Sequence, residues 1–280
     1  MSVTNFIPEL WSARLASSLD RSLTLGNLAN RNWEGEIAGV GSVVHIQMPQ
    51  DLVVANYPAS GAITYAAPTS TQTDLTIDQK RYVAFAVEDI DEAQANVSLV
   101  DVYTNRVGVA LAEDIDTYLA TLYTEALAAN SLTATWSAAD PSNYYSTMVS
   151  LAAALDVQNV PRAGRWVVVS PLIYSLIVQS PVVVAPIPTQ AQTVQGGALG
   201  MLAGFELYMS NAVVIDGAST NVHHIIAGDA ESLTVATQLQ EVEALRDQDR
   251  FRDLFRGLLV YGAAVPNPAR LATVAITATA

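Results

Sequence analysis

One helical pattern, which runs from Ser98 to Asn130, constrains the fold of this chain more than any other feature of its sequence. A helix of about thirty residues, with a rise of about 1.5 Å per residue, would be roughly 45 Å long. That length exceeds what an ordinary globular domain needs and is typical of a structural spine, which we predict here. Marker residues recur along the segment at helical spacing: Leu99, Val102, Arg106, Val109, Ile115, Leu119, Leu122 and Ala126.

Two strand patterns surround a segment of small residues ahead of this helix. The first strand is predicted in "GSVVHIQMP", which begins at Gly41, and the second in "DLTIDQKRYVAFAVED", which begins at Asp74. Residues 50–73 are rich in Ala, Ser, Thr and Pro and show no helical period. We expect an extended hairpin whose tip needs a surface to lie on, because a tip with few large side chains cannot bury itself.

The remaining segments alternate between helix and strand patterns. Residues 5–37 are predicted to form a short amphipathic arm, and Asp140 with Pro141 marks the start of a helix that ends near Asp156. A buried strand in "RWVVVS", a helix over 170–179, and strands at 205–209 and in "HHIIAG" indicate an α+β or α/β subdomain. Three closing strands are predicted in "LTVATQ", "GLLVYGAAV" and "ARLATVAI".

Charge and composition exclude several classes of protein. The formal net charge is −14 with a single lysine, Lys80, so the chain lacks the clustered basic residues with which nucleic-acid readers bind phosphate. It contains no cysteine, which excludes disulfides, thiol catalysis and cysteine-ligated metals. The N-terminus lacks a signal-peptide pattern and prolines interrupt the most apolar stretch, so we expect a soluble, unexported chain without a membrane segment.

The sequence holds little catalytic or cofactor-binding chemistry. His45 falls in a predicted strand, where a partly buried, hydrogen-bonded histidine is expected, and the adjacent His223 and His224 would point to opposite faces of theirs. Neither a GxxxxGK motif nor a GxSxG elbow occurs. We therefore predict no catalytic residue, metal or cofactor. Four glycines lack the spacing of a dinucleotide site and are interpreted as a loop: Gly196, Gly197, Gly200 and Gly204.

Two acidic clusters allow a second interpretation. The cluster that contains Glu88, Asp89, Asp91 and Glu92 could supply an acid–base pair for sugar hydrolysis or ligands for a hard cation. The favoured interpretation is the acidic first turn of a helix, where negative charge faces the positive end of the helix dipole. The cluster "AEDID", which ends at Asp116, is interpreted as the polar side of the long helix.

Residues 241–256 form a block dense in both signs of charge, in a chain with few charges elsewhere. In a helix, three-residue neighbours would attract and four-residue neighbours repel, at about 0.2–0.5 kcal/mol per pair, so the two sets cancel. The block is therefore expected to be a solvated loop or to need a complementary surface elsewhere. An extended segment would place like charges side by side on one face: Asp247 with Asp249, and Arg250 with Arg252.

The order of these motifs carries a resemblance to a known family. The chain contains the arm "FIPELWSARLASSLDRSLTLGNLANRNWEGEI", the hairpin motifs "GSVVHI" and "LTIDQ", the helix motif "VALAEDIDTYLA" and the closing "QLQEVEALRDQDRFRDLFRGLLVYGAAVPNPARLA". Over essentially its whole length it resembles the tailed-phage major capsid proteins of the Hong Kong 97 type. The resemblance implies an α+β, Hong Kong 97-like capsid fold. Its parts would be an N-terminal arm (1–36), an extended loop or E-loop (37–88), a peripheral domain with the spine helix (89–140), an inserted axial domain (141–227) and peripheral-domain strands (228–280).

The same resemblance implies a structural and non-enzymatic function. Hexamers and pentamers of one chain would form an icosahedral shell in the virion, after assembly in the host cytoplasm, around double-stranded DNA that is enclosed without sequence-specific binding. A portal and a scaffolding protein are expected partners, and a decoration protein is an optional one. The candidate inter-subunit contacts are Arg246, Asp247, Asp249, Arg250, Arg252, Asp253, Arg256, Arg14, Trp11, Tyr57 and Tyr65.

Two departures from the family pattern lead to further expectations. Some relatives carry a long N-terminal scaffolding segment that a protease removes; here a short arm precedes "WEGEI", so a separate scaffolding protein is expected. Some relatives join subunits by a lysine–asparagine isopeptide bond, but Lys80 lies in the returning strand and not at the loop tip, so no such cross-link is expected.

Two other functions stay open at the level of the sequence. An encapsulin-like cargo compartment would share the architecture and size range. An acidic hydrolase that uses carboxylates such as Glu88 and Asp91 would instead be a monomer or small oligomer with a cleft.

Overall fold

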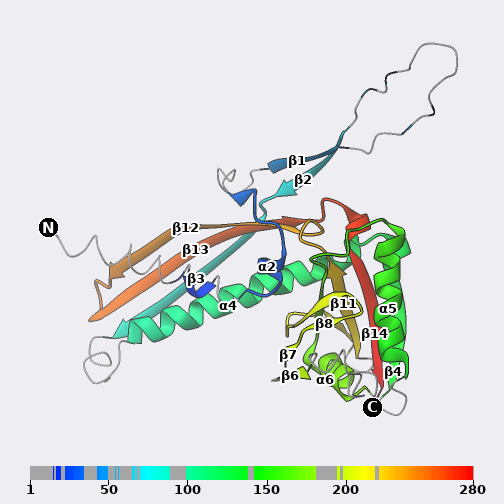
Figure 1. The fold of residues 1–280 in the computed structure, drawn as a ribbon. Coiled ribbons are helices and arrows are strands. Elements are labelled where there is room, and N and C mark those ends of the chain that lie inside the picture. Colours follow the sequence, from blue (N-terminus) through cyan, green and yellow to red (C-terminus); the bar gives the residue numbers. More distant parts are fainter. Residues whose placement is uncertain are drawn as a thin grey trace.

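Three bodies make up the molecule, which is described here from a computed structural model (Figure 1). A two-stranded hairpin projects away from the rest, a three-stranded sheet lies along a long helix, and a larger sheet with helices beside it forms the third body. The structure describes residues 15, 17–19, 23–34, 43–49, 54, 56, 65, 67, 70–88, 99–137, 142–180, 194–195, 198–217 and 221–279.

The long helix α4 (Leu99–Thr121) confirms the predicted spine. Its 23 residues span about 35 Å, less than expected, because the regular helix ends at Thr121. Two 3-10 turns follow it, η3 (Leu122–Glu125) and η4 (Ala128–Asn130). The buried side chain of Asn130 donates hydrogen bonds to the carbonyl oxygens of Ala269 at 2.9 Å and Leu271 at 3.1 Å. These bonds fix the point at which the chain enters strand β4 (Ser131–Ser137).

A three-stranded antiparallel sheet lies on the spine. Its order is β12 (Thr234–Arg246), β13 (Arg252–Ala264) and β3 (Gln79–Glu88). Alternate side chains along each strand point to opposite faces, so one set can pack on α4 while the other faces away. The first hydrophobic core forms between the two, from Val87, Phe255, Leu259 and Tyr261 of the sheet and Leu111, Ala112, Ile115 and Leu119 of the helix.

The projecting hairpin pairs β1 (Val43–Pro49) antiparallel with β2 (Ser70–Thr76). The prediction of one long returning strand is wrong, since β2 ends at Thr76 and β3 begins in another sheet. The strands separate where β13 meets the hairpin: a Cβ atom on Gly262 would lie 2.2 Å from the Thr76 carbonyl oxygen. A small second core joins the hairpin to the sheet and consists of Val44, Ile46, Leu75, Ile77, Ala236, Val260 and Ala264.

The third body is a seven-stranded sheet with the order β4-β14-β11-β5-β9-β8, in which β10 also pairs with β11. Its remaining strands are β5 (Trp166–Val169), β8 (Met201–Leu202), β9 (Phe205–Met209), β10 (Ile215–Asp216), β11 (Val222–Gly228) and β14 (Ala272–Thr279). A third core holds helices α5 (Ser142–Val157) and α6 (Pro171–Gln179) against it. A separate pair consists of β6 (Val194–Gln195) and β7 (Ala198–Leu199). Parallel and antiparallel pairs occur in one sheet, so the fold is α+β.

Most elements predicted for this body are confirmed. The motif "RWVVVS" contains the fully buried β5, the helix predicted over 170–179 is α6, and the strand at 205–209 is β9. The strand predicted in "ARLATVAI" is confirmed as β14, which lies between β11 and β4, in a different sheet from β12 and β13. The glycine-rich loop includes a tight turn at Ala203 and Gly204, whose φ angles are 51° and 89°. Asp140, Pro141, Gly196 and Gly197 lie outside the described residues.

The described residues of the N-terminal arm pack on the spine. Leu15, Leu19 and Leu23 are buried in the same core as α4, together with the short helix α2 (Leu25–Leu28). The approach is close, since a Cβ atom on Gly108 of α4 would lie 2.6 Å from Ser18 Cβ. The apolar side predicted for the arm is thus confirmed for these residues.

Candidate inter-subunit surfaces

The charged block 241–256 forms the outer part of the β12–β13 hairpin, so it is neither a helix nor a solvated loop. The antiparallel register sets opposite charges across from each other: Arg246 Nη1 lies 2.8 Å from Asp253 Oδ1, and Arg256 forms an ion pair with Glu243. The expectation that an extended block would need a complementary surface elsewhere is therefore wrong for these four residues. The neighbouring strand places an opposite charge across from each of the four, which the pattern along one strand does not show.

Asp247 organises the turn at the end of this hairpin. Its side chain, 12% exposed, accepts hydrogen bonds from Arg252 Nε at 2.5 Å and from the backbone N–H of Asp249 at 3.0 Å. These two bonds, the backbone one first, lower the pKa of Asp247 below its usual value. Asp249 and Arg250 are exposed and form no ion pair within the part of the chain that the structure describes. The bonds to Asp247 thus hold the turn in shape, and the opposite charges of Asp249 and Arg250 can contact another molecule.

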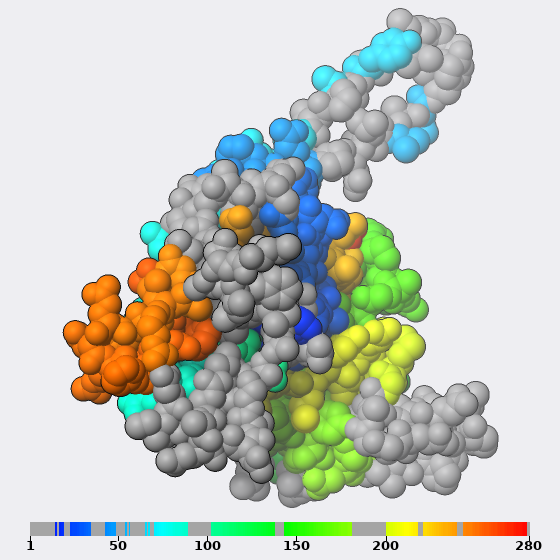
Figure 2. Space-filling view, turned by 90° about the vertical axis from the view of Figure 1, so that its left-hand side faces the viewer, coloured from blue at the N-terminus to red at the C-terminus, as the bar shows by residue number. Residues whose placement is uncertain are grey.

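The β1–β2 hairpin leads to two of the most exposed large apolar residues that the structure describes, Val54 and Tyr65. The described residues beyond its two strands stand clear of the body in the space-filling view (Figure 2). Tyr65 is 89% exposed there, which agrees with its prediction as a contact to another subunit. The other predicted contacts Trp11, Arg14 and Tyr57 lie outside the described residues.

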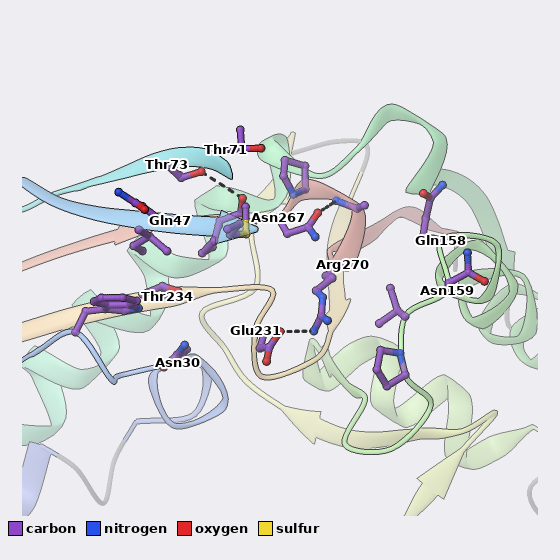
Figure 3. Close-up of a pocket in the computed structure, with 18 residues that line it drawn as sticks. Asn30, Gln47, Thr71, Thr73, Gln158, Asn159, Glu231, Thr234, Asn267 and Arg270 are labelled. Atoms are coloured by element: carbon purple, nitrogen blue, oxygen red, sulfur yellow. Dashed lines mark hydrogen bonds and ion pairs between the residues drawn. The ribbon is translucent and has the colours of Figure 1, made fainter. Parts of the chain in front are cut away.

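A groove of about 1030 Å³ lies at the base of this hairpin, where the three bodies meet (Figure 3). Its lining is mostly amide, hydroxyl and proline side chains, and Arg270 contributes an ion pair with Glu231 at 2.7 Å. Thr73 Oγ1 donates to the carbonyl oxygen of Pro266 at 3.4 Å across one side. Such a lining suits hydrogen bonding to an extended backbone and contains no nucleophile with a general base beside it. Its labelled residues are Asn30, Gln47, Thr71, Thr73, Gln158, Asn159, Glu231, Thr234, Asn267 and Arg270.

Asp116 is a functional residue that the sequence interpretation missed. The cluster "AEDID" is the polar side of the helix only in part: Glu113 is exposed, but Asp116 is 3% exposed. Its two carboxylate oxygens accept hydrogen bonds from the backbone N–H groups of Thr24 at 2.7 Å and Gly26 at 2.9 Å. Burial raises the pKa of Asp116, and the backbone bonds oppose that rise. The side chain therefore anchors the arm to the spine.

Asp114, two residues earlier, joins the spine to the sheet. Its Oδ2 atom accepts hydrogen bonds from the hydroxyl of Tyr261 at 2.6 Å and from Arg81 Nε at 2.7 Å. Burial, followed by the bond to this carboxylate, raises the pKa of Tyr261. The spine thus contacts the arm and the sheet through different polar residues of one cluster.

The three histidines have structural partners. His223 and His224 do point to opposite faces: buried His223 Nδ1 lies 2.8 Å from Ser170 Oγ, and His224 Nε2 lies 2.8 Å from Asp216 Oδ2. Burial lowers the pKa of His223. His45 bonds to Asp74 at 2.7 Å as expected, but its side chain is 57% exposed, so the prediction of partial burial is wrong. The described residues contain no group of three metal-ligating side chains.

The hydrolase interpretation finds no support at the acidic cluster. Glu88 ends strand β3 and does not begin a helix, while Asp89, Asp91 and Glu92 lie outside the described residues. Among the described helices, none has the length and apolar character needed to cross a bilayer.

Solved structures place the fold in one class. The chain is similar to a structure from Mycobacterium phage Che8, with 30% identity, 90% of each chain covered and a TM-score of 0.72. It is also similar to the capsid of the cyanophage P-SCSP1u (15% identity, 90% and 86% covered, TM-score 0.68) and to a virus-like particle from Pyrococcus furiosus (11% identity, 94% and 96% covered, TM-score 0.59). The last two likenesses show the fold alone. The class is that of tailed-phage shell subunits.

The family model described as "Phage capsid protein" matches residues 70–274. The chain belongs to this family and is a major capsid protein, which forms the shell of the virion and has a structural, non-enzymatic role. The search of curated proteins returns no match. The family match favours the phage capsid over the encapsulin-like compartment and the acidic hydrolase.

Proposed function

We propose that this capsid protein has the Hong Kong 97-like division into arm (1–36), E-loop (37–88), peripheral domain (89–140 and 228–280) and axial domain (141–227). The observation that carries the proposal is the projecting β1–β2 hairpin, which is attached to the body through a small core and has a tyrosine 89% exposed beyond its strands. A two-stranded hairpin is marginally stable alone, so it needs a partner surface. In this division β4 and β14 fall in the peripheral ranges, although they belong to the same sheet as β5, β9 and β11.

The subunits would associate as hexamers and pentamers of one chain. The projecting hairpin of one copy lies on the next, and repeated small contacts add up to a stable shell through multivalency. The candidate contacts on the hairpins are Tyr57, Tyr65, Asp249 and Arg250, with Trp11 and Arg14 on the arm. Arg246, Asp247, Arg252, Asp253 and Arg256 contribute by shaping the β12–β13 hairpin, because each has an ion-pair partner within it.

The remaining partners follow from the same proposal. The shell encloses double-stranded DNA without reading its sequence, which agrees with a formal net charge of −14 that disfavours tight binding to phosphate. A portal, a separate scaffolding protein and, in some shells, a decoration protein complete the particle, and assembly takes place in the host cytoplasm.

Negative-stain electron microscopy of the purified protein, with and without co-expressed scaffold, tests this proposal. We expect uniform closed shells several times wider than a single subunit. If every condition yields small soluble species instead, the proposed mode of assembly is wrong.

A further inference from the structure

Phe251 lies at the end of the β12–β13 hairpin. Its aromatic side chain is not buried against the rest of the described subunit, so packing within the subunit does not explain it. It is 81% exposed and follows Asp249 and Arg250, which form no ion pair with any residue that the structure describes. The turn beneath it is braced by Asp247, whose backbone N–H also donates to the carbonyl oxygen of Arg252 at 3.1 Å. In the space-filling view the orange end of this hairpin forms a projection of its own (Figure 2). A braced turn holds Phe251 outward at little further entropic cost on binding.

The same sheet carries an apolar hollow on the face that points away from α4. Tyr82, Ala84 and Leu258 point to that face, since Val83 and Leu259 pack with the core on the other. The hollow has a volume of about 370 Å³, and Ala84, a small residue beside Tyr82 and Arg256 on this face, leaves room for it. Tyr82, which is 80% exposed, forms one wall. A second apolar hollow of about 350 Å³ continues it and shares Ala84 and Arg256.

Charge at the hollow complements charge at the projecting turn. The rim carries the Glu243–Arg256 ion pair, which uses Glu243 Oε2 with Arg256 Nε and Nη2. Glu243 Oε1 and Arg256 Nη1 are therefore available for a further partner. The turn offers the matching opposite charges, Arg250 and Asp249, on either side of one peptide bond and next to Phe251.

Phe251 cannot reach the hollow of its own chain. Leu258 pairs with Tyr82 in the sheet, so the hollow lies about seven residues along β13 from Phe251, which is roughly 20 Å on a rigid strand. The occupant must come from another molecule. A shell subunit meets many copies of itself, and each copy carries both the projecting aromatic residue and the hollow.

We propose that Phe251 of one subunit inserts into the Tyr82–Ala84–Leu258 hollow of a neighbouring copy, with Arg250 facing Glu243 and Asp249 facing Arg256 across the contact. The inference rests on the proposed assembly of the shell. Because the two surfaces differ, the contact is head-to-tail, and such contacts close into rings when the rotation between copies allows it. An aromatic anchor in a dry pocket with a charged rim is the usual composition of an energetically dominant contact.

Disulfide trapping tests this contact directly, since the natural chain has no cysteine. The variant Glu243→Cys/Arg250→Cys keeps Phe251 and places the two thiols at positions that face each other across the proposed contact. Within one chain, β12 continues from Glu243 to Arg246, about 10 Å on a rigid strand, before the turn that carries Arg250. The two cysteines of one chain therefore cannot bond to each other, because a disulfide needs Cα atoms within about 7 Å. We expect oxidised shells to give covalently linked multimers on a non-reducing denaturing gel. The matched control is Glu243→Cys/Val157→Cys, which should give no multimers, since Val157 is also exposed, at 76%, but lies on α5.

Each result separates this inference from the proposed assembly. Shells of the double variant that release single chains on the gel would overturn the insertion of Phe251 but leave the shell proposal intact. Failure of the unchanged protein to form shells would overturn the proposed assembly itself. If the cysteine variant does not assemble, Phe251→Leu and Phe251→Ser decide the matter through the denaturant midpoint for shell dissociation. Insertion predicts a midpoint near that of the unchanged protein for leucine and a clear loss for serine; equal midpoints for both would contradict it.

Discussion

At the scale of single residues, two buried charged side chains, Asp116 and Arg165, are held mainly by backbone groups. The carboxylate of Asp116 accepts hydrogen bonds from two backbone N–H groups of the arm. Arg165, which is 3% exposed, donates hydrogen bonds to the carbonyl oxygens of Ala152, Val160 and Pro161. A buried charge without such partners would lower the free energy of unfolding by several kcal/mol. That is a large share of the roughly 5–15 kcal/mol by which a folded domain is stable. These residues therefore fix how one segment sits on another.

Asp116→Asn is expected to loosen the arm. An asparagine side chain keeps one acceptor oxygen, but its NH₂ group would face a backbone N–H, and an unsatisfied buried donor costs about 1–3 kcal/mol. Amide hydrogen exchange should accelerate at Thr24 and Gly26, and the denaturant midpoint of the subunit should fall. Glu113→Gln, at an exposed position of the same helix, is the control and should change neither. Unchanged exchange at the two amides would contradict the anchoring role.

Asp156, on α5, should make the body with the seven-stranded sheet sensitive to acid. Hydrogen bonds from Arg162 at 2.6 Å and Arg165 at 2.8 Å lower its pKa below the ordinary value of 3.8. A carboxylate with a lowered pKa in the folded state stabilises the fold above its unfolded pKa, and this contribution is lost as the pH falls through the folded value. We expect the thermal midpoint to decline below about pH 4, and to decline less steeply in Asp156→Asn. Identical pH profiles for the two proteins would argue against this assignment.

At the scale of elements, the β12–β13 hairpin shows how pairing changes the meaning of a sequence. Its charges look repulsive along one strand, yet the register pairs Glu243 with Arg256 and Arg246 with Asp253 across two strands. Cross-strand pairs of opposite charge contribute roughly 0.2–1 kcal/mol each, and exposed ones fall at the low end. The two strands of the hairpin thus supply ion-pair partners for each other. Among its described residues, the charged side chains without such a partner lie in the turn.

Arg250→Glu and Arg252→Glu should therefore behave differently. Arg250 has no ion pair in the described structure, so its reversal should leave the isolated subunit as stable as before and impair shell assembly. Arg252 pairs with Asp247 at 2.5 Å, so its reversal sets two carboxylates together and should also disorder the turn. Circular dichroism and hydrogen exchange of unassembled protein, beside electron microscopy of shells, distinguish the two. Normal shells from Arg250→Glu would remove Arg250 from the contact.

Gly262 permits the close approach of β13 to the hairpin. A methyl group at this position would meet the Thr76 carbonyl oxygen at 2.2 Å and backbone atoms of Ile77 near 3.0 Å, so the strands would have to move apart. Overpacking of this kind costs about 1–3 kcal/mol. Gly262→Ala should lower the unfolding midpoint accordingly, while Gly200→Ala, where no atom lies within 4 Å of the added Cβ, should not. A fully stable Gly262→Ala protein would show that the junction can relax.

At the scale of the whole molecule, the projecting hairpin is joined to the rest by few residues, whereas the other two bodies share one large core. The hairpin meets the rest through one small core, and the groove at its base is lined by all three bodies. Interfaces between copies must then supply stability that a single chain lacks.

Mature shells are expected to lack covalent links between subunits. Lys80 is the single lysine, and it lies in β3 opposite Val260, not on the projecting part of the hairpin. After heating in denaturant, shells should run as single chains on a gel. A ladder of multimers in that experiment would show that an isopeptide bond forms after all.

Local patterns in the sequence determined the type of most elements: the spine, the buried β5, helix α6 and strand β9 all follow from periodicity and end signals over a few residues. The family was also readable, because the order of segments is itself a property of the chain. Tertiary structure alone decided which strands pair, where the returning strand divides, and that Asp116 is buried while Glu113 is exposed. The physical reason is distance in sequence. Periodicity reports what a residue does within its own element, whereas Asp116 meets Thr24, Gly262 meets Thr76 and Asp114 meets Tyr261 across 92, 186 and 147 positions, through contacts that no local pattern records.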